Sequence, residues 1–139
     1  MELDFEIGEI DSVAKRLLAY SAGYKIITFN GELGAGKTTL INALCKALGV
    51  KETVTSPTYS LVHEYPADSK EIIYHMDLYR LKSQFEAVDA GLEEYISSGN
   101  YCMIEWPSII ESILPLGFVK CELQVLGTQM RKLVVQLPQ

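Results

Sequence analysis

The segment that most constrains this chain is a glycine-rich stretch at residues 31–38, with the sequence GELGAGKT. It fits the pattern G-x-x-x-x-G-K-[ST] at every fixed position. The glycines allow backbone angles that other residues avoid, and they leave no Cβ between backbone amides and a bound phosphate. Successive N–H groups then converge at the positive end of the following helix, where an anion is stabilised. The pattern therefore predicts a phosphate-binding loop between a strand and a helix.

The flanking segments have the character that such a loop requires. Residues 25–30 (KIITFN) form a short β-branched and aromatic run typical of a buried strand, and residues 38–48 favour a helix that ends at Gly49. We expect Lys37 to reach the β- and γ-phosphates of a nucleoside triphosphate, and the Thr38 hydroxyl to bind Mg²⁺. The residues predicted to bind the nucleotide here are Gly31, Glu32, Leu33, Gly34, Ala35, Gly36, Lys37, Thr38 and Thr39.

The rest of the chain alternates between predicted helices and predicted strands. Helices are expected at 10–20, at 82–98 with a break around Gly91, and at 108–114. Strands are expected at 71–77, at 101–105 and, as a terminal hairpin, at 118–126 and 131–137. Residues 53–66 alternate as a strand does, but Pro57 makes the first half a loop.

This order of elements predicts the fold class. Strands separated by helices indicate parallel βαβ units, and the final hairpin indicates an antiparallel edge. We therefore expect an α/β, three-layer P-loop NTPase fold with a mixed, mostly parallel sheet, in a single domain over residues 1–139.

Composition narrows the surroundings in which this chain works. The net charge of −6 and the pI near 4.9 disfavour a broad contact with nucleic acid by the chain alone. No apolar stretch approaches the roughly 20 residues that span a bilayer, and the acidic N-terminus is unlike a basic leader, so we expect a cytoplasmic protein. The three cysteines stand far apart among apolar neighbours, which favours buried thiols over disulfides or zinc.

Two of the predicted strands after the loop end on an acid, Asp77 and Glu105. The carboxyl ends of parallel strands meet at one edge of a sheet, beside the predicted phosphates. We predict that Glu105 holds Mg²⁺ together with Thr38, and that Asp77 positions water or binds through the magnesium shell. Lys37, Asp77 and Glu105 are thus the predicted catalytic residues, although a strand-end carboxylate can also be a solvated surface group.

Other polar residues have two interpretations each. The segment Thr55-Ser56-Pro57-Thr58-Tyr59 is either a switch whose hydroxyl senses the γ-phosphate or an ordinary turn. His75 is more typical of a core histidine than of a catalyst. The remaining candidates are Arg80, which neutralises phosphate or pairs with a carboxylate; Trp106, a partner anchor or a core residue; and Arg131 and Lys132, which reach a base or decorate an edge strand.

Four segments, GELGAGKTT, SPTYSLVHEY, YHMDLYRL and IEWP, occur in the order and approximate spacing typical of the TsaE family, also called YjeE. The chain resembles this family over essentially residues 10–135. The resemblance implies an ATPase, using ATP and Mg²⁺, that is needed to make threonylcarbamoyladenosine in tRNA at the adenosine next to the anticodon. It also implies action with TsaB and TsaD, contact with tRNA only through that complex, and no membrane association.

The resemblance assigns roles to individual residues. Lys37 and its loop match the phosphate site, Thr38 and Glu105 the magnesium positions, and Asp77 the aspartate implicated in hydrolysis. Ser56, Pro57, Thr58 and Tyr59 match the switch loop, and Trp106 matches the tryptophan after the Walker-B-type glutamate. One position departs: the family commonly has a threonine near the adenine where this chain has Ile10, and its C-terminal basic position corresponds to Arg131.

Three alternative functions can be compared with the motifs. A small GTPase would carry an N/T-K-x-D motif and a D-x-x-G switch, and the sequence has neither. A small-metabolite kinase usually needs an acceptor-binding insertion, for which 139 residues leave little room. A nucleotide-sensing module without significant turnover stays open, since the same acids would hold magnesium in it.

Overall fold

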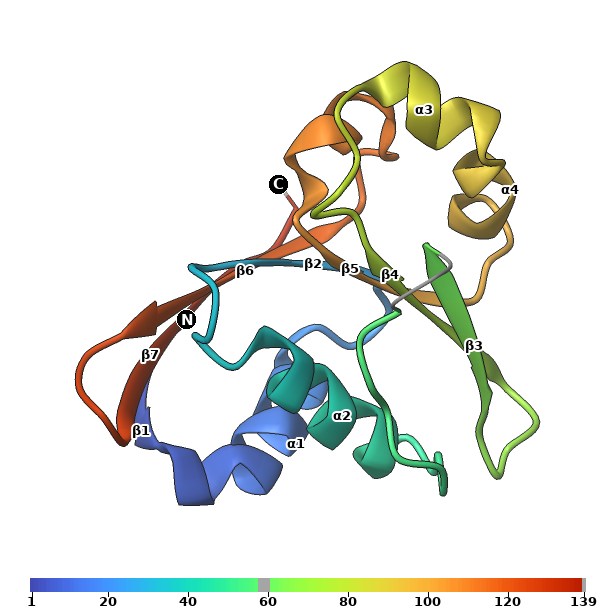
Figure 1. Ribbon diagram of the computed structural model, residues 1–139. Coiled ribbons are helices and arrows are strands. Elements are labelled where there is room, and N and C mark those ends of the chain that lie inside the picture. Colours follow the sequence, from blue (N-terminus) through green and yellow to red (C-terminus); the bar gives the residue numbers. More distant parts are fainter. Residues whose placement is uncertain (58–60, 139) are drawn as a thin grey trace.

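The computed structural model describes residues 1–57 and 61–138. It is a three-layer α/β fold in which one seven-stranded sheet lies between two layers of helices (Figure 1). One face is covered by α1 (Ile10–Tyr20) and α2 (Lys37–Ala47). The other is covered by α3 (Gln84–Asp89), α4 (Leu92–Ile96) and the 3₁₀ helices η2 (Pro107–Ile109) and η3 (Glu111–Ile113).

The strand order in the sheet is β1-β7-β6-β2-β5-β4-β3. The strands are β1 (Glu2–Glu6), β2 (Ile26–Asn30), β3 (Val62–Pro66), β4 (Ile72–Asp77), β5 (Tyr101–Glu105), β6 (Val119–Val125) and β7 (Met130–Gln136). The central strands β6, β2, β5 and β4 are parallel, whereas β7 and β3 run antiparallel to their neighbours. The carboxyl ends of β2, β5 and β4 therefore meet at one edge, which is where the functional site is expected in such sheets.

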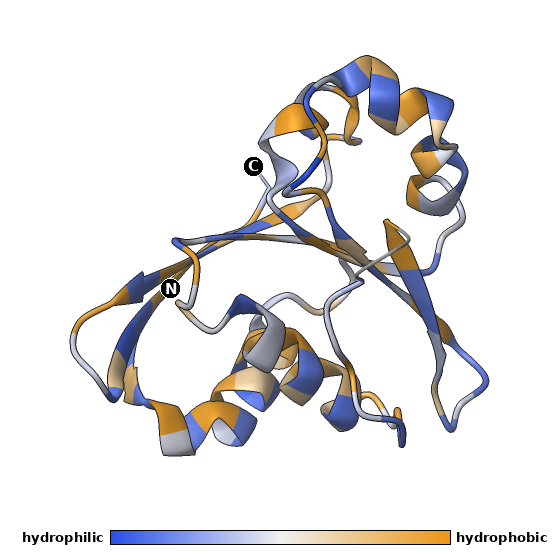
Figure 2. Ribbon diagram, in the orientation of Figure 1, coloured by the Kyte–Doolittle hydropathy of each residue, from blue (hydrophilic) through white to orange (hydrophobic). Residues whose placement is uncertain are grey.

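Alternation along the strands places successive side chains on opposite faces. Ile73 and Met103 belong to the hydrophobic cluster that includes the buried residues of α1 and α2, whereas Met76 and Ile104 belong to the cluster that includes those of α3 and α4. Figure 2 shows hydrophobic and hydrophilic residues alternating along the helices of both layers. A strand buried on both faces reads as a nearly continuous apolar run, as in the sequence of β5.

Most of the predicted elements are confirmed, including the mixed α/β sheet, the helix at 10–20 and the strand at 101–105. The break around Gly91 separates α3 from α4, and its φ of 81° is the left-handed backbone that glycine adopts most easily. The predicted single helix at 108–114 is wrong in detail, because that segment forms the two short 3₁₀ turns η2 and η3.

The terminal hairpin exists, but its predicted place at the edge of the sheet is wrong. A strand that the sequence analysis did not expect, β1, pairs antiparallel with β7 and covers it. Its sequence ELDFE alternates apolar and acidic residues, and Phe5 is buried. The acids face Lys132, which lies 3.7 Å from Glu2 and 4.0 Å from Asp4. β1 continues through the short 3₁₀ helix η1 (Ile7–Glu9) into α1.

Two further expectations concern absences and thiols. In the part of the chain that the structure describes, no helix combines the length and the apolar character needed to cross a membrane. The three cysteines, Cys45, Cys102 and Cys121, are free and buried, and burial raises the pKa of each thiol to about 12. The prediction of buried, unreactive thiols is confirmed.

Candidate nucleotide-binding site

The glycine-rich loop connects β2 to α2, as the sequence pattern predicts, and two of its glycines are required by geometry. Gly36 precedes the first residue of α2 and has a φ of 107°, a left-handed backbone that side chains disfavour. At Gly31 a Cβ would lie 2.6 Å from the backbone oxygen of Leu123, so the loop packs directly on β6. The N-terminal N–H groups of α2 have no partners within the helix, which leaves them available to an anion.

Lys37, the first residue of α2, is buried behind the loop. Its Nζ donates to the backbone oxygen of Glu32 at 3.1 Å and to that of Gly31, and it lies 3.8 Å above the ring of Trp106. Burial lowers the pKa of Lys37, while the nearby carboxylates of Glu105 and Asp77 oppose that shift. The result is a desolvated cation held by neutral groups, which a phosphate can displace.

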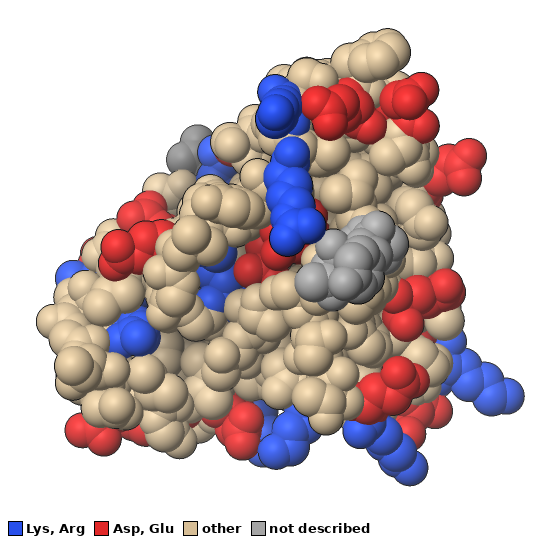
Figure 3. Space-filling model, viewed as in Figure 1, with Lys and Arg blue, Asp and Glu red and all other residues tan. Residues whose placement is uncertain are grey.

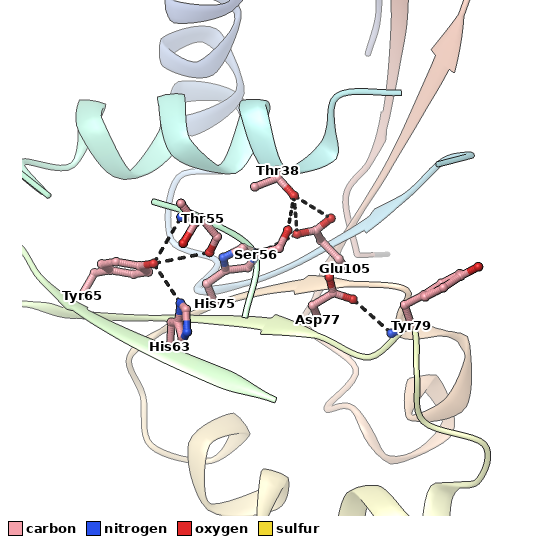
Figure 4. Close-up of polar contacts among 9 residues, drawn as sticks. All are labelled: Thr38, Thr55, Ser56, His63, Tyr65, His75, Asp77, Tyr79 and Glu105. Atoms are coloured by element: carbon pink, nitrogen blue, oxygen red, sulfur yellow. Dashed lines mark hydrogen bonds and ion pairs between the residues drawn. The ribbon is translucent and has the colours of Figure 1, made fainter. Parts of the chain in front are cut away.

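Thr38 meets Glu105 directly, and this contact joins the loop to the end of β5 (Figure 4). The Thr38 hydroxyl donates to Glu105, with Oγ1 2.9 Å from Oε2 and 3.2 Å from Oε1. The same hydroxyl shares a hydrogen bond of 2.7 Å with Ser56 Oγ. Glu105 is only 3% exposed, so this carboxylate is not a solvated surface group.

His75 was expected to be an ordinary core histidine, and it is fully buried on β4. However, its Nε2 atom lies 2.7 Å from Oε2 of Glu105. A carboxylate oxygen accepts, so Nε2 carries the proton and donates it. The contact with Glu105 could not be found from spacing, because it depends on the pairing of β4 with β5.

Asp77 ends β4, and its Cα is the register partner of that of Glu105 on β5. Its Oδ1 accepts the backbone N–H of Tyr79 at 3.1 Å. Burial raises the pKa of Asp77, the N–H of Tyr79 opposes the shift, and the charge of Glu105 adds to it. The two predicted acids are therefore neighbours at one strand edge, as expected.

These residues line a cavity of about 300 Å³ that opens beside the loop. Its wall includes Lys37, Thr38, Ser56, Asp77 and Glu105. Figure 3 shows basic and acidic atoms together in a hollow near the centre of this face. The oxygen donors suit Mg²⁺, which binds through one or two carboxylates plus phosphate and water. Within residues 1–57 and 61–138 no group of three or more His, Cys, Asp or Glu residues forms a metal cage, so a shared ion fits best.

A second cavity, of about 130 Å³, lies on the other side of the loop. It shares Gly34, Gly36 and Thr39 with the first cavity. Its other walls are the side chains of Phe5, Ile7, Ile10, Leu123 and Arg131 and the loop residue Ala35. Sequence reasoning placed Ile10 and Arg131 at the nucleotide but missed Phe5, Ile7 and Leu123. The alternation of Leu3 and Phe5 with acids was the available signal, since it is the pattern of a half-buried strand.

Arg131 connects this second cavity to the loop backbone. Its Nε donates to the backbone oxygen of Ala35 at 2.8 Å, and its Nη1 donates to the backbone oxygens of Gly127 at 2.7 Å and Met130 at 2.9 Å. The guanidinium therefore supports the loop from β7. Lys132, the other basic candidate, pairs with acids of β1 instead.

The segment before β3 is anchored on both sides. The N–H of Val54 donates to Asn42 Oδ1 at 3.1 Å, and the Tyr65 hydroxyl lies 3.4 Å from both backbone N and O of Thr55 (Figure 4). His63 Nδ1 contacts the same hydroxyl at 3.1 Å. These anchors, on α2 and β3, were not expected from the sequence.

The remaining switch and partner candidates differ in where they lie. Ser56 reaches the cavity and Pro57 is half-buried, whereas Thr58 and Tyr59 fall outside the described residues. Arg80 is exposed, outside the cavity wall that the described residues form. Trp106 lines the cavity with a φ of 58°, a left-handed conformation that costs a non-glycine residue about 1–3 kcal/mol.

A phosphate-binding loop after the central strand of such a sheet, with acids on the neighbouring strand ends, defines a P-loop α/β protein. The model of one family, described as threonylcarbamoyl adenosine biosynthesis protein TsaE, matches residues 6–133. The chain belongs to the TsaE family.

Curated relatives carry the name tRNA threonylcarbamoyladenosine biosynthesis protein TsaE. The chain is 38% identical to the one from Bacillus subtilis over 107 residues, which cover 77% of this chain and 66% of that protein. It is 43% identical to that from Haemophilus influenzae over 90 residues, covering 65% and 56% of the two chains. The match to the Rickettsia bellii protein, at 38% identity, covers 88% and 85%. The matched regions thus span just under two thirds, or less, of the first two relatives.

A solved structure supports the fold over the whole chain. The crystal structure of YdiB from Bacillus subtilis superposes with a TM-score of 0.72 and 26% sequence identity, covering 100% of this chain and 87% of that one. The predicted P-loop fold with a C-terminal antiparallel hairpin is therefore confirmed.

Proposed function

We propose that this chain is the ATP-binding and ATP-hydrolysing component of tRNA threonylcarbamoyladenosine synthesis, acting with TsaB and TsaD. Family membership supports the pathway. The observation that carries the nucleotide chemistry is the direct contact of Thr38 with Glu105, which joins the loop to β5 beside Lys37 and Asp77 in one cavity. A phosphate cation, a metal-binding hydroxyl and two acids are the parts that P-loop hydrolysis requires.

The phosphates would lie in the larger cavity, over the N-terminus of α2. The backbone oxygens that hold Lys37 are neutral acceptors, so the exchange of Glu32 for a charged phosphate oxygen strengthens the hydrogen bond. Burial of Lys37 favours that exchange, because a desolvated cation gains more from an anionic partner.

Thr38 and Glu105 would hold Mg²⁺, and Asp77 would lie next to them. When bound, this ion neutralises charge on the β- and γ-phosphate oxygens. Asp77 would orient the attacking water, and the raised pKa of its carboxyl makes it a better proton acceptor than an ordinary aspartate.

The base would occupy the smaller cavity, whose walls of Phe5, Ile7, Ile10 and Leu123 suit the faces of adenine. The two cavities share three loop residues, which is the arrangement expected when one ligand extends from phosphate to base across the loop.

The net charge of −6 agrees with a subunit that leaves tRNA binding to its partners. Leu33 and Tyr79 line the larger cavity yet are 67% and 54% exposed, so a partner that covers the site would bury them together with Trp106. A cytoplasmic location stays a prediction from the sequence.

The test is phosphate release from ATP and from GTP, measured with and without TsaB and TsaD. We expect slow ATP hydrolysis by the chain alone and a changed rate when both partners are present. Preference for GTP, or a rate indifferent to the partners, would overturn the proposal. Tight ATP binding without phosphate release under any condition would favour the nucleotide-sensing alternative, and transfer of phosphate to a small metabolite would favour a kinase.

A further inference from the structure

We infer that His75 is a positioning residue that fixes the carboxylate of Glu105 for a divalent cation. The inference rests on the proposed function, because it concerns the same cation site. It starts from the geometry of one buried contact, in which His75 Nε2 lies 2.7 Å from Oε2 of Glu105.

Stability alone does not account for a histidine at this position. His75 is 0% exposed, on the sheet face that packs against α1 and α2, and its register partner on β5 is the buried Met103. Its Nδ1 atom has no hydrogen-bond partner among the residues that the structure describes. A buried polar atom without a partner destabilises a fold, so an apolar side chain would pack here at lower cost.

Glu105 is held from two sides, and only one of them is outside the cavity. Thr38 and Ser56 both line the cavity, where phosphate, cation and water compete for their hydroxyls. His75 lies behind the carboxylate, outside the wall that the described residues give this cavity. The hydrogen bond from His75 is therefore the contact of Glu105 that no ligand displaces.

The contact also selects which oxygen faces the cation. Oε2 accepts from His75 and, at 2.9 Å, from Thr38, whereas Oε1 has a longer contact of 3.2 Å with Thr38. Oε1 is thus the oxygen more available for coordination. Metal-binding carboxylates are commonly oriented by such a hydrogen bond from behind, and its loss typically weakens metal binding tenfold to a hundredfold.

The experiment uses three variants of the full chain. His75→Leu removes the donor, while His75→Gln restores one, because the glutamine amide nitrogen is as many bonds from Cα as Nε2. Ile73→Val is the matched control: it perturbs the same buried face of β4, two residues away, without touching Glu105. Binding of Mn²⁺ with a non-hydrolysable ATP analogue is measured by electron paramagnetic resonance. Binding of the analogue in EDTA and the Tm are measured in parallel.

We expect His75→Leu to weaken Mn²⁺ binding about tenfold or more, to leave analogue binding in EDTA unchanged, and to keep or raise the Tm. His75→Gln should recover most of the Mn²⁺ affinity. Ile73→Val should lower the Tm and leave Mn²⁺ binding unchanged.

Two outcomes separate this inference from the function on which it rests. If His75→Leu binds Mn²⁺ as well as the unaltered chain does, or if His75→Gln fails to recover affinity although it folds, the positioning role is wrong while the proposed function stands. If the unaltered chain itself does not bind Mn²⁺ with the analogue, both are overturned.

Discussion

The two cavities beside the loop share Gly34, Gly36 and Thr39 but are built in opposite ways. The larger one is lined by charged groups from the loop and from the strand ends of β4 and β5. The smaller one is lined mostly by apolar side chains from the two ends of the sequence, such as Phe5 and Leu123. The first can bind phosphate through charge, and the second can bind a base through shape and apolar contact.

The difference between the cavities teaches how unevenly the binding energy should be distributed. Hydrogen bonds to charged groups contribute about 1.5–3 kcal/mol each, whereas burying one methylene contributes about 0.8 kcal/mol. Substitutions in the larger cavity should therefore have the larger effects on nucleotide binding, and substitutions around the smaller one should alter affinity modestly and base preference more.

Lys37→Ala should break the comparison at its strongest point. Loss of the cation removes two or more charge-assisted contacts to phosphate, so we expect ATP affinity to fall about 100-fold. Isothermal titration calorimetry measures the change. Lys46→Ala is the control, because Lys46 stands on the last turn of the same helix, exposed and 3.5 Å from Asp11. Equal losses in both variants would mean that general charge, and not the loop geometry, drives binding.

Glu105→Ala and Asp77→Ala should separate the two acids of the larger cavity. Glu105 contacts Thr38, so its loss should weaken Mg²⁺-dependent ATP binding about tenfold to a hundredfold while leaving binding in EDTA intact. Asp77→Ala should reduce turnover more than affinity, by about 100-fold if the carboxylate orients water. Titrations with and without Mg²⁺, alongside phosphate-release assays, distinguish the two. Small and equal effects from both would show that the acids lie outside the reaction.

The contrast between the cavities also explains what could be predicted from the sequence. The larger cavity was predictable because its residues stand in short motifs whose chemistry is local: the loop, and the acids Asp77 and Glu105 at the ends of apolar runs. Parallel pairing of β4 with β5 then brings the acids together. The glycines, the strand and the following helix are consistent at every level, which is typical of strongly specified sites.

The smaller cavity was not predictable because it is assembled by long-range pairing. Phe5 reaches the site only because β1 adds to β7, and its Cα is the register partner of that of Arg131. The sequence of β1 alternates clearly, but five residues rich in acids have low strand propensity on their own. Tertiary pairing overrides that propensity, since the acids of β1 face Lys132 and the apolar residues pack on the core.

Arg131→Ala tests whether the smaller cavity depends on support from β7. Without the hydrogen bond to the backbone oxygen of Ala35, the loop loses an anchor, and we expect ATP affinity to fall about tenfold. The neighbouring Lys132→Ala is the control, because Lys132 pairs with β1 at the surface and should change affinity less than twofold. Fluorescence titration with a labelled ATP measures both. If the two variants behave alike, Arg131 does not support the loop.

Asp77→Asn tests whether the charged cavity is a cost to stability. Asparagine keeps an acceptor for the N–H of Tyr79 but removes the buried charge. The pKa of Asp77 is raised above its ordinary value of 3.8, so the folded protein binds the proton more tightly than the unfolded chain does. The unaltered protein therefore loses stability as the pH rises from about 3.8 through the raised pKa.

The Tm of Asp77→Asn should consequently exceed that of the unaltered protein by a few degrees at neutral pH. The gap should close as the pH falls toward 4, where the carboxyl is protonated in both states. Thermal unfolding followed by circular dichroism over this pH range gives the difference. A gap that is independent of pH would have to come from packing, not from the charge.

Ile10→Thr should give the smallest effect and sharpen the comparison most. Ile10 is a half-buried wall of the smaller cavity, at the position where the family commonly has threonine near the adenine. The change removes about one methylene of apolar contact and adds a hydroxyl, so ATP affinity should change threefold or less. Ile113→Thr, a half-buried isoleucine on the opposite face of the sheet, controls for stability. Titration with ATP and GTP should show a shift in base preference for Ile10→Thr alone, because only that residue lines the base cavity. If neither base preference nor affinity moves, the adenine does not lie against Ile10, and the apolar cavity would have to bind something other than the base.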